Sequence, residues 1–146
     1  MSEMTHNLNW GAIELFAMDV DGVLTDGSLY VSSDGSETKR FSIIDGLGLV
    51  MLREAGVKIA WISGRGSEAT DRRAEELKVD FVIQGRKDKA EALLTLLEKL
   101  DLKPEQVAYM GDDTIDTGAI QLAAIGVAVP EAQPEHPVPD LRRFHG

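Results

Sequence analysis

The feature that most restricts the fold of this chain is an alternation of short, β-rich apolar runs with longer segments of helical periodicity. The apolar runs are Leu15–Met18, Lys58–Ile62, Phe81–Ile83, Val107–Met110 and Gly126–Val129. Helical patterns separate several of them, over Leu47–Glu54, Glu68–Leu77 and Lys89–Leu100. Strands that alternate with helices predict an α/β fold, in which a Rossmann-like, doubly wound parallel sheet is covered by helices.

The segment from Ser28 to Ile43 departs from this alternation. It contains Leu29–Val31, an Asp34-Gly35 turn and Thr38–Phe41, which together predict a β-hairpin inserted after the first strand. The hairpin and one helix occupy the whole interval before the second strand, so no lid domain fits there. We therefore expect a single domain over residues 1–146, with no cap domain and with an irregular, proline-rich tail over about residues 130–146.

The composition limits the partners and the chemistry of the chain. Fifteen Lys and Arg against twenty-five Asp and Glu give a net charge of −10, which repels nucleic acid and anionic membrane surfaces. The chain has no cysteine, which excludes disulfides, thiolate catalysis and cysteine-ligated zinc. It also has neither a basic N-terminal region before an apolar run nor an apolar stretch of membrane-spanning length. We expect a soluble, cytoplasmic protein whose partner is a small molecule.

The densest group of chemically useful residues follows the first predicted strand directly. Asp19 and Asp21 stand two positions apart in the run Asp19-Val20-Asp21-Gly22-Val23-Leu24-Thr25. Ligands of open α/β sheets bind just beyond the carboxyl ends of strands, and Gly22 lets the chain turn so that both carboxylates approach one site. Taken alone, the pattern also fits a solvated acidic turn. A calcium loop is excluded, because Leu24 occupies the position where an EF-hand needs Gly.

A second acidic cluster follows the predicted strand Val107–Met110 and contains Asp112, Asp113 and Asp116. Carboxylates that converge from two strand ends raise each other's pKa or recruit a cation. Because the ligands would all be oxygens, the two clusters together favour a hard ion, and Mg²⁺ is the usual one beside phosphate. On its own, the second cluster also fits a helix N-terminus that carries favourable acids.

Two further motifs between the acidic clusters suit phosphate binding. Ser63-Gly64-Arg65 follows the second strand and offers a hydroxyl and backbone N–H groups, although Ser-Gly after a strand also fits a simple turn. Lys89 begins the leucine-rich helix, where its charge would neutralise the aspartates and the phosphate together. We interpret the neighbouring Arg86 and Lys87 as solvated, and Trp61 as part of the core.

The chain resembles the haloacid dehalogenase superfamily in four motifs that occur in the expected order. They are Asp19-x-Asp21, Ser63-Gly64-Arg65, Lys89 and Gly111-Asp112-Asp113-x-x-Asp116. Three further stretches make it similar to the small uncapped subfamily that includes 3-deoxy-D-manno-octulosonate 8-phosphate phosphatases. These stretches are Asp45-Gly46-Leu47-Gly48, Arg72-Arg73-Ala74 and Gln84-Gly85-x-x-x-Lys89. The resemblance runs from about Ile13 to Val129.

The resemblance implies a phosphatase and assigns catalytic roles to the acidic residues. Asp19 would be the nucleophile that takes the phosphoryl group as an aspartyl-phosphate, and Asp21 would protonate the leaving alkoxide and later activate water. Mg²⁺ would be bound by the Asp19 carboxylate, the Asp21 backbone carbonyl and Asp112. Asp113 and Asp116 would support this site from the side.

The resemblance also implies a substrate, a phosphorylated sugar acid of lipopolysaccharide biosynthesis. Ser63, Gly64 and Lys89 would bind its phosphoryl oxygens, while Arg65 and the hairpin would recognise the sugar acid. The relatives that this chain resembles form homotetramers, in which hairpins pack together and a neighbouring subunit helps to cover the site. We therefore expect a homotetramer.

Two departures from the subfamily bear on the substrate. Ile44 stands where relatives usually carry an Arg, and the sequence after Val129 is proline-rich where relatives have a glycine-rich segment and a final helix, so we expect the enclosing tail to be missing. A nine-carbon, sialic-acid-type 9-phosphate is the alternative substrate, although Arg65 favours the eight-carbon one. A catalytically silent binding module is a further hypothesis, and the accumulation of mutually repelling carboxylates argues against it.

Overall fold

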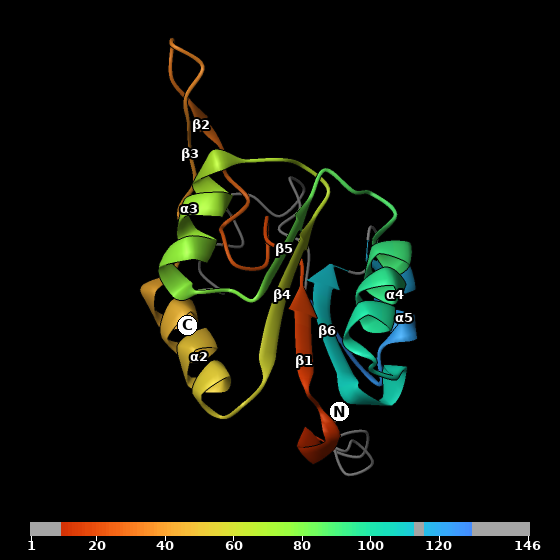
Figure 1. The fold of residues 1–146 in the computed structure, drawn as a ribbon. Helices are drawn as coiled ribbons and strands as arrows, with labels where there is room; N and C mark the ends of the chain where they lie inside the picture. The colour runs from red at the N-terminus through yellow and green to blue at the C-terminus, as the bar shows by residue number, and fades with distance from the viewer. Residues whose placement is uncertain (1–9, 113–115, 130–146) are drawn as a thin grey trace, which may run out of the picture.

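A five-stranded parallel sheet forms the centre of the protein (Figure 1), in the strand order β5-β4-β1-β6-β7. The structure is a computed structural model that describes residues 10–112 and 116–129, without the side chain of Asp112. The strands of the sheet are β1 (Leu15–Met18), β4 (Lys58–Ser63), β5 (Phe81–Gln84), β6 (Val107–Asp112) and β7 (Ile125–Val129). Each apolar run identified in the sequence is a strand, which confirms the predicted α/β fold.

Helices cover both faces of the sheet (Figure 1). In the described part of the chain, α2 (Ile43–Glu54) and α3 (Glu68–Leu77) pack on one face, while α4 (Lys89–Leu100) and α5 (Thr117–Leu122) pack on the other. Side chains of a strand alternate between the two faces. In β1, Leu15 and Ala17 accordingly join the cluster under α4 and α5, whereas Met18 joins the cluster under α2 and α3. The sheet is doubly wound, as predicted.

The predicted hairpin is present, but its ladder is shorter than expected. Strands β2 (Tyr30–Val31) and β3 (Glu37–Thr38) pair in antiparallel fashion, whereas the sequence predicted strands of three and four residues. Tyr30 and Val31 are 59% and 64% exposed, so no packing partner in the described chain extends the ladder. The hairpin projects beyond the sheet at the carboxyl ends of the parallel strands (Figure 1).

Helix α2 begins at Ile43, four residues before the predicted start at Leu47. Ser42 explains the earlier start, because its hydroxyl accepts a hydrogen bond from the Asp45 N–H at 3.2 Å and thereby caps the helix. The acidic side chain of Asp45 is also favourable in the first turn. Between β1 and β4 the chain forms only short loops, the hairpin and α2, which confirms that no cap domain is inserted there.

Short helical elements escaped the sequence analysis. They are α5 and two 3-10 turns, η1 (Trp10–Ala12) and η2 (Pro104–Gln106). Six residues in α5 and three in each turn are too few for a helical period to stand out. Across residues 10–112 and 116–129, every helix is too short or too polar to cross a membrane.

The connections that follow β1 and β6 lead to opposite edges of the sheet. In open α/β sheets, ligands bind at the carboxyl ends of such a strand pair. From β1 the chain continues to β4 on one side, whereas β6 and β7 lie on the other side. The register places Met18 opposite Met110, and the Asp19 N–H donates to the Met110 carbonyl at 3.0 Å. Asp19 and the end of β6 therefore leave the sheet next to each other.

Candidate active site

Asp19 lies directly after β1 and is only 6% exposed. Its Oδ1 accepts a hydrogen bond from the Val20 N–H at 2.7 Å and pairs with Lys89 Nζ at 2.9 Å. The chain then turns at Gly22, whose φ of 83° lies in the left-handed region that favours glycine. As predicted, this turn keeps Asp19 and Asp21 at the same end of the sheet, where both line one cleft.

Lys89, the first residue of α4, joins Asp19 to Asp116 in a buried network. Its Nζ also lies 2.9 Å from Asp116 Oδ1, and the Tyr109 hydroxyl donates to that same oxygen at 2.6 Å. Asp116 fits there because Gly111 has no side chain: a Cβ on Gly111 would lie 2.5 Å from Asp116 Cγ. The sequence analysis missed Tyr109, although a tyrosine in an otherwise apolar strand is a signal for a buried polar partner.

Among the described residues, the buried network holds two carboxylates and one ammonium group. Burial raises the pKa of Asp19 to about 6; Lys89 opposes the rise and Asp116 adds to it. Burial alone would lower the pKa of Lys89, but its two carboxylate partners outweigh that effect and keep the pKa of Lys89 above its usual value. A divalent cation beside Asp19 would relieve the excess negative charge.

Asp21 lies on the hairpin side of the cleft and pairs with a second lysine. Lys39, just after β3, places its Nζ 2.8 Å from Asp21 Oδ1 and donates to the Thr70 hydroxyl in α3 at 3.2 Å. The Lys39 side chain is 2% exposed, whereas that of Asp21 is 39% exposed. The sequence analysis missed Lys39, because a lysine in a hairpin carries no local signal that separates a buried one from a solvated one.

Thr25 fixes the loop that carries the two aspartates. Its hydroxyl oxygen accepts hydrogen bonds from the N–H groups of Gly22 at 3.2 Å and Gly27 at 3.1 Å. Thr25 also forms an isolated antiparallel bridge with Phe41, in the segment that leads into α2. The loop after β1 is therefore tied to the far end of the hairpin.

The predicted motif Ser63-Gly64-Arg65 forms the wall of the cleft after β4. Ser63 is buried, and its hydroxyl donates to the Arg65 carbonyl at 3.0 Å and accepts from the Arg65 N–H at 3.3 Å. A Cβ on Gly64 would lie 3.6 Å from Cγ of Lys87, so the two residues are close neighbours. The Arg65 guanidinium forms an ion pair with Glu37 of β3. Arg65 thus connects the cleft to the hairpin.

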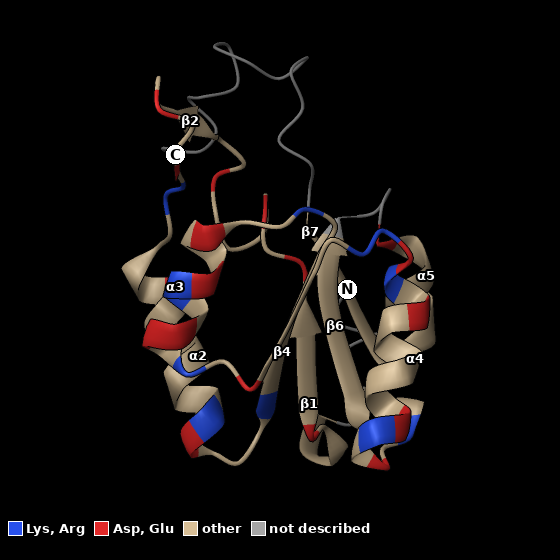
Figure 2. Ribbon diagram, turned by 45° about the horizontal axis from the view of Figure 1, so that its top comes forward, with Lys and Arg blue, Asp and Glu red and all other residues tan. Residues whose placement is uncertain are grey.

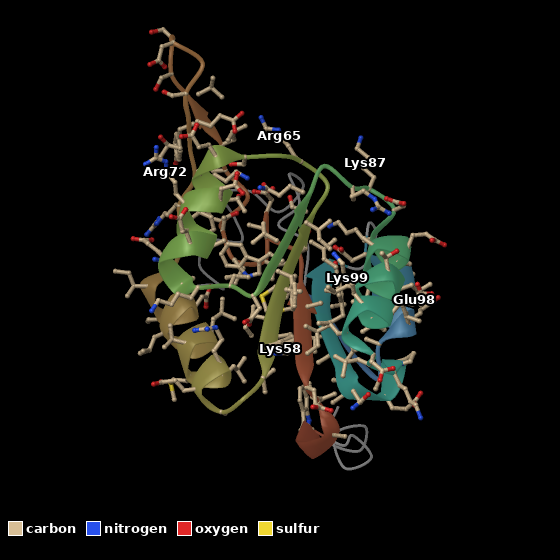
Figure 3. All side chains as sticks on the ribbon, viewed as in Figure 1. Lys58, Arg65, Arg72, Lys87, Glu98 and Lys99 are labelled. Atoms are coloured by element: carbon tan, nitrogen blue, oxygen red, sulfur yellow. The ribbon has the colours of Figure 1, made fainter. Side chains whose placement is uncertain are left out.

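A cleft of about 390 Å³ brings these residues together. Its lining consists of Asp19, Asp21, Ser63, Gly64, Arg65, Lys87 and Lys89. Lys87, interpreted from the sequence as solvated, is exposed and also borders the cleft. Figure 2 shows acidic and basic residues in the loops at this end of the sheet, and Figure 3 places Arg65 and Lys87 there, with Lys58 toward the opposite end of β4.

A larger hollow of about 910 Å³ lies beside this cleft, between the β3 side of the hairpin and α3. Its lining includes Glu37 and Lys39 but neither Asp19 nor Asp21. We place the chemistry in the smaller cleft, because the buried carboxylate with a strongly shifted pKa lies there.

The predicted metal site is described only in part. Asp113 and the side chain of Asp112 lie outside the described residues, so the metal site of Asp19, Asp21 and Asp112 stays a prediction, as does the supporting role of Asp113 and Asp116. Among the side chains that the structure describes, no group of three or more acidic or histidine residues is arranged to hold a metal ion. The oxygen donors at this edge of the sheet suit a hard cation such as Mg²⁺.

The parallel sheet, with a buried aspartate–lysine pair at its topological switch point, defines a known class of protein. A family model described as haloacid dehalogenase-like hydrolase matches residues 79–136, and solved structures of such proteins share both fold and sequence with this chain. The chain belongs to the haloacid dehalogenase-like hydrolases, which confirms the resemblance stated above.

The chain is similar to 3-deoxy-D-manno-octulosonate 8-phosphate phosphatases in particular. The enzyme from Moraxella catarrhalis, solved with magnesium, phosphate and KDO, is 46% identical at a TM-score of 0.80, over 84% of this chain and 71% of that one. The Yersinia pestis enzyme is 39% identical at a TM-score of 0.80, over 86% and 68%. The phosphatase KdsC of Escherichia coli K12 is 39% identical over 84% of this chain. The chain spans 65% of the length of that curated relative.

Proposed function

We propose that this protein is a Mg²⁺-dependent phosphomonoesterase that acts through an aspartyl-phosphate on Asp19. The observation that carries the proposal is the ion pair between Asp19 and Lys89 at the carboxyl end of β1, in a cleft that Asp21 also lines. A buried carboxylate with a perturbed pKa beside a cation is typical of a catalytic nucleophile. The phosphatase relatives support the same activity.

Two steps complete the reaction. First, an oxygen of Asp19 attacks phosphorus while the bond from phosphorus to the ester oxygen breaks, and the leaving oxygen takes the proton of the Asp21 carboxyl to depart as an alcohol. Second, Asp21 accepts a proton from water as the water oxygen attacks phosphorus. The bond to Asp19 then breaks and inorganic phosphate leaves. Lys89 stabilises the negative charge on the phosphoryl oxygens throughout.

The metal would be held by the Asp19 carboxylate, the Asp21 backbone carbonyl and Asp112. Burial raises the pKa of Asp19 to about 6 and Asp116 adds to the rise, which supports this placement because a bound cation would favour the ionised carboxylate. When bound, Mg²⁺ supplies positive charge against the phosphoryl oxygens and orients them for attack. Asp113 and Asp116 would support the site from the side.

We propose a phosphorylated sugar acid as the substrate, with 3-deoxy-D-manno-octulosonate 8-phosphate as the first candidate. The names of the relatives support this choice. Arg65 and Lys87 add two cationic side chains to the cleft, which suits a substrate that carries a carboxylate as well as a phosphate. Ser63 and Gly64 would contribute polar groups for the phosphoryl oxygens.

We also propose that the protein works as a homotetramer. Large apolar side chains are exposed on the hairpin and on α2, namely Tyr30, Val31, Ile43, Ile44, Leu47 and Met51. Ile43 and Ile44 are 83% and 80% exposed, as expected for a surface that another subunit covers. Such packing would also screen an uncapped site from water. Sedimentation analysis should give the mass of a tetramer, and a stable monomer at micromolar concentration would reject this assembly.

Hydrolysis of p-nitrophenyl phosphate with and without Mg²⁺ tests the activity itself. We expect turnover only with the metal, and Asp19→Asn should lower kcat by at least about 1,000-fold, because it removes the nucleophile. Asp26→Asn is the matched control, since Asp26 is an exposed acid of the same loop that lies outside the cleft lining.

Turnover without any divalent ion, or an active Asp19→Asn variant, would reject the mechanism. If neither p-nitrophenyl phosphate nor phosphorylated sugar acids of eight and nine carbons react, a silent binding module becomes the better explanation. Comparison of kcat/KM between the two sugar acids separates the substrate hypotheses.

A further inference from the structure

Lys39 is a buried lysine at the active site that the reaction above leaves without a role. We propose that Lys39 is a positioning residue, which holds the carboxylate of Asp21 in place for proton transfer to the leaving group. The proposal rests on the proposed function, because it assumes that Asp21 is the general acid.

The contacts of Lys39 join three segments that are distant in sequence. From the end of the hairpin, its Nζ contacts Asp21 in the loop after β1 and the hydroxyl of Thr70 in the first turn of α3. The contact with Asp21, at 2.8 Å, involves only Oδ1. This contact leaves Oδ2 of the same carboxylate unoccupied by Lys39, and Asp21 lines the cleft with its side chain 39% exposed.

Anchoring of the hairpin does not by itself explain a buried ammonium group. Phe41 already holds the end of the hairpin, because its ring stacks on Trp61 with centroids 6.2 Å apart and its backbone bridges to Thr25. An apolar side chain at position 39 would serve the same purpose without the free energy needed to bury a charge. The charge of Lys39 is therefore directed at its one carboxylate partner among the described residues, Asp21.

The proposal predicts a dependence on the leaving group. An alkoxide needs the proton of Asp21 in order to leave, whereas p-nitrophenolate leaves readily without one. The ratio kcat/KM covers only the steps up to departure of the first product, so the later role of Asp21 in activating water does not enter it. Two esters of nearly equal size, p-nitrobenzyl phosphate and p-nitrophenyl phosphate, isolate the proton transfer.

The experiment compares both esters in Lys39→Met, Thr70→Val and the control Lys58→Met. Lys39→Met should lower kcat/KM by about 100-fold on the benzyl ester but by less than about 3-fold on the phenyl ester, because only the former needs a general acid. Thr70→Val keeps the ion pair and removes one hydrogen bond, so the same selectivity should appear at roughly 5-fold. Lys58 is exposed at the far end of β4, and its replacement should change neither ester (Figure 3).

Equal losses on the two esters, or no loss, would overturn the role of Lys39, since a merely structural lysine has no reason to discriminate between leaving groups. If melting curves show that Lys39→Met does not fold, Thr70→Val decides by the same criterion. A wild-type protein that hydrolyses neither ester would instead show that the proposed function has failed.

Discussion

On each side of the cleft, one of the two lining aspartates pairs with a lysine, but the two ion pairs have opposite surroundings. On the sheet side, Asp19 shares Lys89 with Asp116, and all three residues are buried. On the hairpin side, Asp21 is the one carboxylate among the described residues that pairs with Lys39, and its side chain is 39% exposed. The comparison matches the two proposed tasks. A nucleophile benefits from a dry, fixed position, whereas an acid that gains and loses protons needs access to water.

The two sides of the cleft also differ in their balance of negative and positive charge. Among the described side chains, the sheet side has two carboxylates for one ammonium group, which favours a further cation there. In the part of the chain that the structure describes, the hairpin side holds a one-to-one pair, Asp21 with Lys39. If the comparison is right, replacement of either lysine will lower activity, but the two losses will differ in kind.

The largest effect is expected from Lys89→Met. Loss of Lys89 removes charge from the phosphoryl oxygens, so kcat/KM should fall by about 1,000-fold on p-nitrobenzyl and p-nitrophenyl phosphate alike. It also leaves Asp19 and Asp116 buried without their cation, which should lower the free energy of unfolding by about 3–5 kcal/mol in urea titrations. Lys99→Met, at an exposed position of the same helix, is the control. If Lys89→Met lowered kcat/KM only on the benzyl ester, Lys89 would behave like Lys39, and the proposed difference between the two lysines would be wrong.

A smaller effect is expected on the pH dependence of stability without metal. The pKa of Asp19 rises from 3.8 to about 6 on folding, so the folded state binds this proton more tightly than the unfolded state. The free energy of unfolding should therefore fall by about 2–3 kcal/mol as pH rises through this range, and Asp19→Asn should lack that part of the decline.

Urea unfolding at pH 4 and pH 7.5 in the presence of EDTA measures this difference. The stability of Asp19→Asn relative to wild type should be higher at pH 7.5 than at pH 4, and added Mg²⁺ should stabilise wild type more than the variant. A stability difference that is the same at both pH values would show that burial does not hold Asp19 in this unfavourable state.

The smallest effect is expected at the rim, from Glu37→Gln. The ion pair between Glu37 and Arg65 is partly exposed, so its loss should change the free energy of unfolding by less than about 1 kcal/mol. The variant should nevertheless lower KM for the sugar-acid phosphate by about 2- to 5-fold, because the substrate carboxylate no longer competes with Glu37 for the guanidinium. A neutral sugar phosphate is the control substrate, and an equal change in its KM would contradict this explanation.

The sheet and much of its helical cover could be predicted from the sequence, because the signals are local. The apolar runs correspond to β1, β4, β5, β6 and β7, and the helices predicted over Glu68–Leu77 and Lys89–Leu100 have the observed bounds. The approach of Asp19 to Lys89 also followed from sequence order, since parallel strands bring their carboxyl ends, and the helix starts beyond them, to one edge.

The tertiary structure decided which polar side chains are buried together. Lys39 and Thr70 are 31 positions apart, and their contact depends on the hairpin folding back against α3. Lys87 follows β5 and Gly64 follows β4, and the fold brings the two residues together at the cleft. Periodicity and motifs predicted the strands, most of the helices and the placement of Asp19 and Asp21 at one end of the sheet, because these are properties of neighbouring residues. The second lysine of the site required the folded chain, because burial and pairing of a charge depend on segments that are distant in sequence.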